Sequence, residues 1–115
     1  SEIPAVEIFH VHQSADPNLL QYMLDHYDGV ILAGTGSGNY PKPIQKVIED
    51  YDGPCVIVRS SRLQEGAVYP SDVFDPKHKT IPAFRIPPHK ARILLQLALS
   101  KTKDPQQLTE IFEKY

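Results

Sequence analysis

The sequence predicts an α/β fold with a parallel sheet, in a single domain that spans residues 1–115. The first observation is an alternation, because apolar runs of strand length are followed by segments whose apolar residues recur at helical spacing. The second is a repeated ending: the first two helical segments both close in Tyr-Asp-Gly, and a strand-like run follows each. A length of 115 residues fits one ordinary domain.

The first three elements follow from local signals. The run AVEIFHVH, residues 5–12, is dense in β-branched and aromatic residues and predicts a strand. A helix is expected next, with Asp16 as its N-cap and Pro17 at its first position, and Gly29 ends it. The run VILAG has no polar alternation, which favours a parallel strand covered on both faces.

The cycle then repeats. PKPIQKVIEDYDG, residues 41–53, predicts a second helix, and PCVIVRS, residues 54–60, predicts a further buried strand. The apolar face of that helix is expected to comprise Ile44, Val47, Ile48 and Tyr51. A strand–helix–strand–helix–strand order favours a parallel sheet with right-handed crossovers.

The second half of the chain is less regular. Residues 60–88 are polar and proline-rich and predict a long loop with a short strand at AFRI, residues 83–86. Two helices are expected to close the chain, at 89–102 and 104–115, and Asp104 and Pro105 mark the start of the second. The apolar face of the first is expected to comprise Ile93, Leu94, Leu97 and Ala98.

Charge and composition exclude several classes of partner. A formal net charge of -2 and a pI near 6.2 give no electrostatic footprint for nucleic acid or for an anionic membrane. No run approaches the ~20 apolar residues of a membrane span. The single cysteine, Cys55, cannot form an internal disulfide and is expected to be a buried strand thiol.

The stretch AGTGSGNYP follows a predicted parallel strand, where open α/β sheets bind ligands. Its glycines would let backbone amides approach an anion, but their spacing fits neither a dinucleotide loop nor a P-loop. Asn39 offers an amide donor and acceptor, suited to a zwitterionic ligand. A simple turn that needs positive φ explains the same residues, and the loop alone does not decide between the two.

Other candidate sites are weaker. His10 and His12 point to one face of a strand, but two ligands are too few for zinc, so no metal site is expected. The two serines of RSSR, residues 59–62, do not lie in a Gly-x-Ser-x-Gly motif, so a serine nucleophile is not expected there. Asp72 and Asp75 lie in the long loop and are solvated acids by default.

Three stretches carry a family resemblance: YDGVILAGTGSGNYP, VIVRSSRLQEGAV and PPHKARILLQLALSKTKDPQQLTEIFEKY. They resemble the C-terminal domain of bacterial L-asparaginases, closest to the type II, glutaminase-asparaginase-like enzymes. The likeness runs from about residue 6 to residue 115, and its last stretch is the most specific. The resemblance implies a three-layer, flavodoxin-like α/β domain, with a small parallel sheet flanked by helices.

The resemblance also implies that the catalytic residues belong to another domain. The family's nucleophilic threonine lies in a Thr-Gly-Gly-Thr stretch of a larger N-terminal domain, with a second threonine and its aspartate and lysine partners. None of the four threonines here, Thr35, Thr80, Thr102 and Thr109, lies in such a motif. This chain is therefore expected to be the smaller half of an amidohydrolase of amino-acid metabolism, with no catalytic residue of its own, no cofactor, and no activity by itself.

The implied role of this half is to bind substrate across a dimer interface. Asn39, at the end of the glycine loop with Gly38 and Ser37, matches the family residue that reaches L-asparagine, or L-glutamine, in the neighbouring subunit. A family carboxylate after the SSR segment approaches the substrate's ammonium group, and Asp72 is the first choice for it and Asp75 the second.

The expected partners are the small-molecule substrate, an N-terminal domain and further copies in a homotetramer. Type II resemblance favours the periplasm, and a cytoplasmic location stays open. Two other functions also stay open: a stand-alone module that binds an acidic amino acid, and the ammonia-releasing domain of a tRNA-dependent amidotransferase.

Overall fold

The computed structural model describes residues 3–34, 40–63, 67–70, 75 and 77–115. Along the chain, the elements are β1 (Val6–His10), α1 (Pro17–His26), β2 (Gly29–Gly34), α2 (Lys42–Asp50), β3 (Val56–Ser61), β4 (Thr80–Pro82), α3 (Pro88–Leu99) and α4 (Pro105–Lys114). The three-layer α/β fold that the sequence predicts is confirmed.

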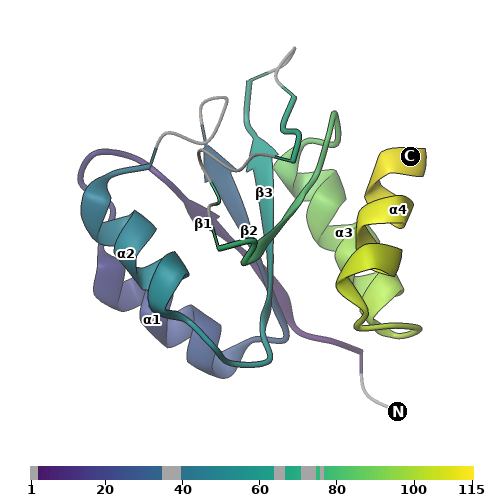
Figure 1. Ribbon diagram of the computed structural model, residues 1–115, viewed down its shortest axis with the longest axis horizontal. Helices are drawn as coiled ribbons and strands as arrows, with labels where there is room; N and C mark the ends of the chain where they lie inside the picture. Colours follow the sequence, from purple (N-terminus) through teal and green to yellow (C-terminus); the bar gives the residue numbers. More distant parts are fainter. Residues whose placement is uncertain (1–2, 35–39, 64–66, 71–74, 76) are drawn as a thin grey trace.

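The sheet has four parallel strands in the order β1-β2-β3-β4. Helices α1 and α2 cover one face, and α3 and α4 cover the other (Figure 1). The first two crossovers therefore lie on the same side of the sheet, and the chain changes sides after β4. This parallel arrangement brings the carboxyl ends of all four strands to one edge.

Two apolar clusters, one on each face, form the core. Val30 and Leu32 belong to the cluster under α1 and α2, whereas Ile31 belongs to the cluster under α3 and α4. All three side chains are 0% exposed. Full burial of both faces of β2 explains its unbroken apolar sequence.

The predicted helix caps are confirmed. The Asp16 carboxylate accepts a hydrogen bond from the Asn18 N–H at 2.9 Å, and the Asp104 carboxylate accepts one from the Gln107 N–H at 3.1 Å. A proline follows each cap at the first helical position, where its missing N–H costs nothing.

Two details of the second half differ from the sequence prediction. The short strand is Thr80–Pro82 rather than residues 83–86, because it is these three residues that pair with β3. Helix α3 is also rotated relative to the predicted face. Its buried residues include Ala91 and Leu95, which were not predicted, and Ala98, which was. By contrast, the predicted Ile93 is 51% exposed and Leu97 is 62% exposed.

Helix α3 approaches the sheet closely at Gly29, the first residue of β2. A methyl group added to Gly29 would lie 2.6 Å from Leu95 Cδ2 and 3.2 Å from Val6 Cγ2. The glycine therefore permits the contact between this helix and the sheet. Within the described part of the chain, no helix has the length and apolar character to cross a membrane.

Candidate functional site

Strands β2 and β3 end at the carboxyl edge of the sheet, ahead of the stretches of sequence that contain the predicted site residues. Gly34 ends β2 directly before segment 35–39, and β3 ends at Ser61 ahead of the long loop. Four predicted substrate-binding residues, Ser37, Gly38, Asn39 and Asp72, lie outside the described residues. The structure does describe the residues that flank them, and these form a buried polar network.

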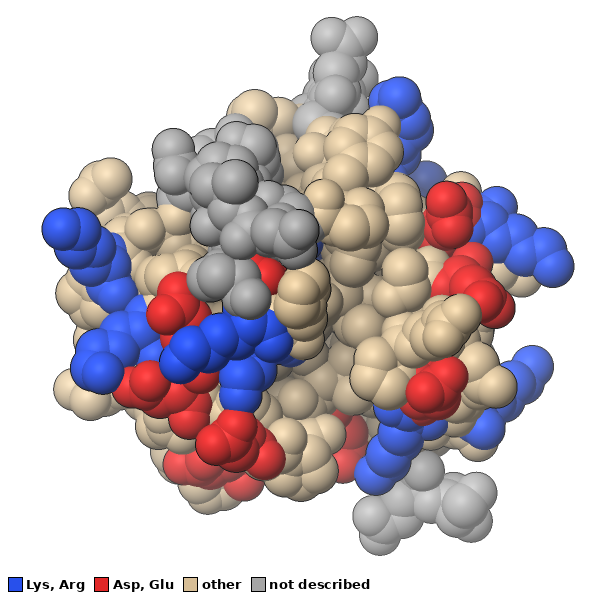
Figure 2. Space-filling model, in the orientation of Figure 1, with Lys and Arg blue, Asp and Glu red and all other residues tan. Residues whose placement is uncertain are grey.

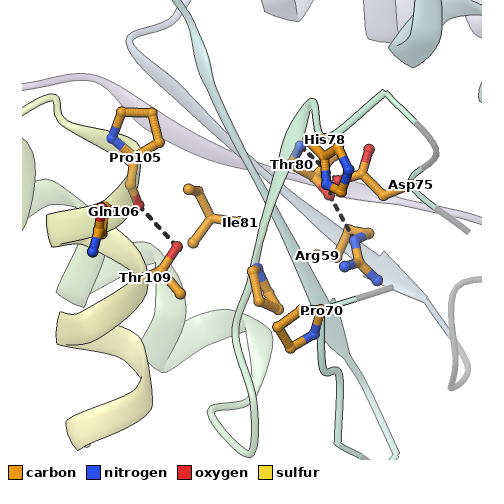
Figure 3. Close-up of a pocket in the computed structure, with 10 residues that line it drawn as sticks. Arg59, Pro70, Asp75, His78, Thr80, Ile81, Pro105, Gln106 and Thr109 are labelled. Atoms are coloured by element: carbon orange, nitrogen blue, oxygen red, sulfur yellow. Dashed lines mark hydrogen bonds between the residues drawn. The ribbon is translucent and has the colours of Figure 1, made fainter. Parts of the chain in front are cut away.

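The centre of this network is Arg59, on β3. Its side chain is 1% exposed, although it carries a positive charge. Nε donates to the Thr80 hydroxyl at 2.7 Å (Figure 3). Nη2 donates to the Tyr69 carbonyl oxygen at 3.1 Å. Among the described residues, Nη1 has no hydrogen-bond partner.

Asp75 completes the network on the other side of Thr80. Its Oδ2 accepts from the Thr80 hydroxyl at 2.6 Å and from the Thr80 N–H at 3.0 Å, and its Oδ1 accepts from the Lys79 N–H at 2.9 Å. The residue is 5% exposed. The second-choice substrate carboxylate is thus bonded within the chain through both of its oxygens.

The Thr80 hydroxyl connects two opposite charges. It accepts a hydrogen bond from the Arg59 guanidinium and donates one to the Asp75 carboxylate. A buried charge is costly unless hydrogen bonds and an opposite charge compensate it, and this relay supplies both. Thr80 and Arg59 lie on the same face of the sheet. Thr80 pairs with Ile57, which is two residues before Arg59 in β3, and side chains two residues apart in a strand point to the same face.

Tyr40 lies in the same region as the Arg59 network. It directly follows Asn39, and its ring lies over Gly34, where an added methyl group would be 3.4 Å from Tyr40 Cε1. Burial raises the pKa of the Tyr40 hydroxyl, while the charge of Arg59 opposes this rise and that of Asp75 adds to it. The two charges of the network therefore act on the residue next to Asn39.

The hydroxyls of the predicted RSSR segment are engaged in structural bonds. Ser60 donates to the Ile86 carbonyl oxygen at 2.7 Å, and the Ser61 hydroxyl accepts from the Leu63 N–H at 3.2 Å. Both residues are buried, at 1% and 3% exposure. No histidine or carboxylate base is bonded to either oxygen in the described part of the chain, so neither is set up as a nucleophile.

Cys55 is buried directly before β3, as predicted. Burial raises the pKa of its thiol to about 12, and the negative charge of Asp28 adds to the rise. Its N–H donates to the Tyr51 hydroxyl at 2.8 Å. A thiol in this state is a poor nucleophile and a poor metal ligand.

The two histidines of the first strand do not gather with other ligands. His10 is exposed at the end of β1, and His12 Nδ1 accepts from the Ser14 N–H at 3.2 Å. Within the residues that the structure describes, no three His, Cys, Asp or Glu side chains are placed to hold a metal ion.

Acidic and basic side chains are interspersed on the face drawn in Figure 2. Two surface ion pairs illustrate this mixing: Lys46 to Asp50 at 2.7 Å and Lys79 to Asp52 at 2.6 Å. On this face, the described side chains therefore form no extended patch of one sign.

Comparison with known proteins decides the family. The sequence model of the glutaminase/asparaginase C-terminal domain matches residues 5–112, which is almost the whole chain. The chain belongs to this family. The match includes Arg59, Asp75 and Thr80, all of α3, and α4 as far as Phe112.

Curated relatives of this asparaginase C-terminal domain are L-asparaginases. L-asparaginase 2 of Escherichia coli is 37% identical over 118 residues, covering 100% of this chain and 34% of that protein. A probable periplasmic L-asparaginase of Haemophilus influenzae is 34% identical, covering 98% of this chain and 33% of that protein. The domain thus spans about a third of the length of these relatives.

A solved structure agrees with the family and with the fold. The crystal structure of a probable cytoplasmic L-asparaginase from Campylobacter jejuni superposes with a TM-score of 0.84 at 33% identity. The match covers 99% of this asparaginase C-terminal domain and 36% of that chain. Relatives named as periplasmic and as cytoplasmic therefore share this domain.

Sequence reasoning missed Arg59 and Thr80 as parts of the site. The available signal was the arginine itself, because VIVRSS places a charged residue inside an otherwise apolar parallel strand. A charge in such a strand needs buried partners. Its principal side-chain partner, Thr80, is 21 residues away, which no local pattern reveals.

Proposed function

We propose that this chain is the C-terminal domain of an L-asparaginase, an enzyme that hydrolyses L-asparagine to L-aspartate and ammonia. The observation that carries the proposal is the family match over residues 5–112, together with relatives that are L-asparaginases. The reaction needs no cofactor when a threonine forms the acyl-enzyme. We place that threonine in an N-terminal domain, outside this sequence.

The domain is proposed to bind substrate in the active site of a neighbouring subunit. Asn39, supported by Gly38 and Ser37, supplies an amide at the end of the glycine loop, and Asp72 supplies a carboxylate to the substrate's ammonium group. Asp72 is preferred to Asp75, because both oxygens of Asp75 already accept hydrogen bonds within the chain. The low exposure of Asp75, 5%, also favours Asp72 as the substrate carboxylate.

The test uses the two-domain protein, with a catalytic N-terminal domain joined to this chain. Asn39→Ala and Asp72→Asn should each raise KM for L-asparagine about tenfold or more, since each removes a hydrogen bond to a charged ligand worth about 1.5–3 kcal/mol. Asp52→Asn is the matched control, because Asp52 is exposed and bonds only Lys79 among the described residues. Unchanged kinetics in both site variants would refute the assignment.

The domain alone is proposed to be inactive. Three of its four threonines are described, and all three donate hydrogen bonds inside the chain: Thr80 to Asp75, Thr102 to Gln107, and Thr109 to the Pro105 carbonyl oxygen. Thr102 and Thr109 donate to an amide oxygen and a backbone carbonyl oxygen, neither of which is a base. The Asp75 carboxylate that accepts from Thr80 also accepts two backbone N–H bonds. A nucleophilic threonine requires a base that is available to take its proton.

The two-domain protein is proposed to be a homotetramer. Support comes from α3, where Ile93 and Leu97 lie one turn apart and expose 51% and 62% of their surface. Exposed apolar side chains that adjoin one another favour a protein contact. Light scattering on the two-domain protein should give four chains per particle, and a monomer would contradict the proposal.

A further inference from the structure

We propose that the apolar surface where α3 meets the incoming chain is the docking surface for the N-terminal domain of the same two-domain protein. This surface, the entry face, comprises Ile3, Pro4, Ile93, Gln96 and Leu97. The proposal rests on the proposed function, since it takes this chain to be joined to an N-terminal domain. It adds the part of this chain that the N-terminal domain covers.

The entry face combines exposed apolar side chains with an absence of charge. Ile93 is 51% exposed, Leu97 is 62% exposed and Ile3 is 81% exposed. Gln96 and Leu97 follow Ile93 by three and four residues in α3, so these three side chains lie on one face of the helix. Adjoining apolar side chains without charge are typical of the centre of a protein contact.

The chain enters the domain beside this face of α3. Gln96 Nε2 donates to the Pro4 carbonyl oxygen at 3.2 Å, and the Ala5 N–H donates to the Asp28 carboxylate at 2.8 Å. Figure 1 shows the segment before β1 on the side of the sheet that α3 and α4 cover. Only two residues precede Ile3 in the sequence, so an N-terminal domain would be joined to the chain next to the entry face.

The relatives contain enough further chain to cover this surface. The domain covers 34% and 33% of two L-asparaginases, so about two thirds of each relative lies outside the match. The matching family model is that of a C-terminal domain, which places most of this remaining length before residue 1. A segment about twice as long as this chain is sufficient for a domain of its own.

A tethered domain is favoured over a second copy as the occupant. A domain joined through a short linker has an effective concentration on the order of millimolar, about a thousandfold above a separate copy at ~1 µM. Charge gives the same preference. In an antiparallel two-fold contact centred on Ile93 and Leu97, Lys90 of one copy would lie opposite Lys101 of the other, and like charges disfavour such a contact.

Docking at the entry face is compatible with the proposed homotetramer. An N-terminal domain held against α3 gives each subunit one fixed shape. A closed assembly requires such a shape, because every subunit must present the same surfaces in the same relative positions. Ile93 and Leu97 therefore contribute to assembly by completing the subunit.

The first experiment measures whether Leu97 is covered in the two-domain protein. Leu97→Cys, in a Cys55→Ala background, reacts with iodoacetamide, and mass spectrometry of its peptide gives the rate. Leu19→Cys is the matched control, because Leu19 is a leucine with 50% exposure on α1, at the other face of the sheet. We expect residue 97 to react at least about tenfold more slowly in the two-domain protein than in this chain alone, and residue 19 to differ by less than about threefold.

A cross-link identifies what covers residue 97. Benzophenone maleimide is attached to Leu97→Cys in urea, and unlabelled and isotope-labelled two-domain proteins are then refolded as a mixture and illuminated. A cross-link within one chain joins only peptides of the same isotope, whereas one between chains also joins unlike isotopes. We expect cross-links from residue 97 to peptides of the N-terminal domain, in same-isotope pairs only. The iodoacetamide reaction is the independent readout, because it needs no bulky group at the entry face.

Three results overturn the inference. These are equal reaction rates at residue 97 in the two proteins, cross-links to this domain of another copy, and cross-links in mixed-isotope pairs. Light scattering and L-asparagine turnover of the unmodified two-domain protein test the proposed function separately. A monomer or an absence of turnover refutes that function, while same-isotope cross-links to the N-terminal domain still support the inference.

Discussion

Replacing Thr80 by valine tests the energetics of the buried network in this chain. The substitution keeps the shape of the side chain but removes the hydroxyl that accepts from Arg59 at 2.7 Å and donates to Asp75 at 2.6 Å. A hydrogen bond to a charged group contributes about 1.5–3 kcal/mol, and a buried charge that loses its partner adds a desolvation penalty. Both charged residues are nine-tenths or more buried.

The two losses do not add fully. Asp75 keeps two backbone N–H bonds and Arg59 keeps its bond to the Tyr69 carbonyl oxygen. We therefore expect Thr80→Val to lower the free energy of unfolding by about 3 kcal/mol, a large part of the ~5–15 kcal/mol typical of a domain. With a urea m-value of about 1.5 kcal/mol/M, the midpoint should fall by about 2 M.

Urea unfolding followed by circular dichroism measures this shift. Thr80→Ser should lose less than about 1 kcal/mol, because it keeps the hydroxyl and gives up one methyl group. Thr109→Val should stay within about 0.5 kcal/mol of the parent. A loss below about 1 kcal/mol for Thr80→Val, equal to that of Thr80→Ser, would refute the view that the hydroxyl compensates two buried charges.

Three further predictions concern the core. Gly29→Ala should lower the free energy of unfolding in urea by about 1–3 kcal/mol, because its methyl group would lie 2.6 Å from Leu95 Cδ2. An unchanged free energy would mean that α3 moves freely on the sheet. Leu95→Ala should lower the free energy of unfolding by about 2–5 kcal/mol, because Leu95 is 0% exposed. Leu97→Ala should lower it by less than about 0.5 kcal/mol, because Leu97 is 62% exposed. Equal losses would contradict the orientation of α3. Cys55, with a pKa raised to about 12, should react with iodoacetamide at pH 8 at least about tenfold more slowly in the folded chain than in urea.

The thiol also gives a pH dependence with a definite sign. In the unfolded chain Cys55 loses its proton near pH 9.0, whereas in the folded chain it keeps the proton to about pH 12. The unfolded state therefore binds fewer protons in this window, and stability should fall as pH rises from about 9 to 12. Cys55→Ala should flatten that fall in urea titrations, and an identical pH profile would exclude the thiol as its source.

The regular elements of the first half are predictable because their signals are local. Asp16 and Pro17 define the start of α1 without reference to any other part of the chain, and Asp104 and Pro105 do the same for α4. The apolar run of β2 needs only burial on both faces, which the α/β alternation already implies.

The second half depends on contacts that local signals do not contain. Helix α3 is apolar around most of its circumference, so both Leu95 and Leu97 fit a buried face, and the close approach at Gly29 selects Leu95. The strand at Thr80–Pro82 is only three residues long and is defined by its pairing with β3. A three-residue strand carries too little periodicity to be placed from sequence.

The candidate site also has one part that local sequence predicts and one part that only the folded chain shows. The strand before the glycine loop predicts that the loop lies at the carboxyl edge of the sheet, and the family resemblance implies the role of Asn39. Both stay predictions, because residues 35–39 lie outside the described part of the chain. Arg59 and Thr80 are 21 residues apart, and their bond becomes evident only in the folded chain. The burial of Asp75 and its bonds to Lys79 and Thr80 are likewise evident only in the folded chain.

The most direct test of the central claim is ammonia release from L-asparagine and L-glutamine by this 115-residue chain, at high protein concentration and against a heat-killed control. The proposed function predicts no turnover by the chain alone, and turnover of L-asparagine once a catalytic N-terminal domain is joined to it. Turnover by the chain alone would contradict the account, because it would require a nucleophile within this domain.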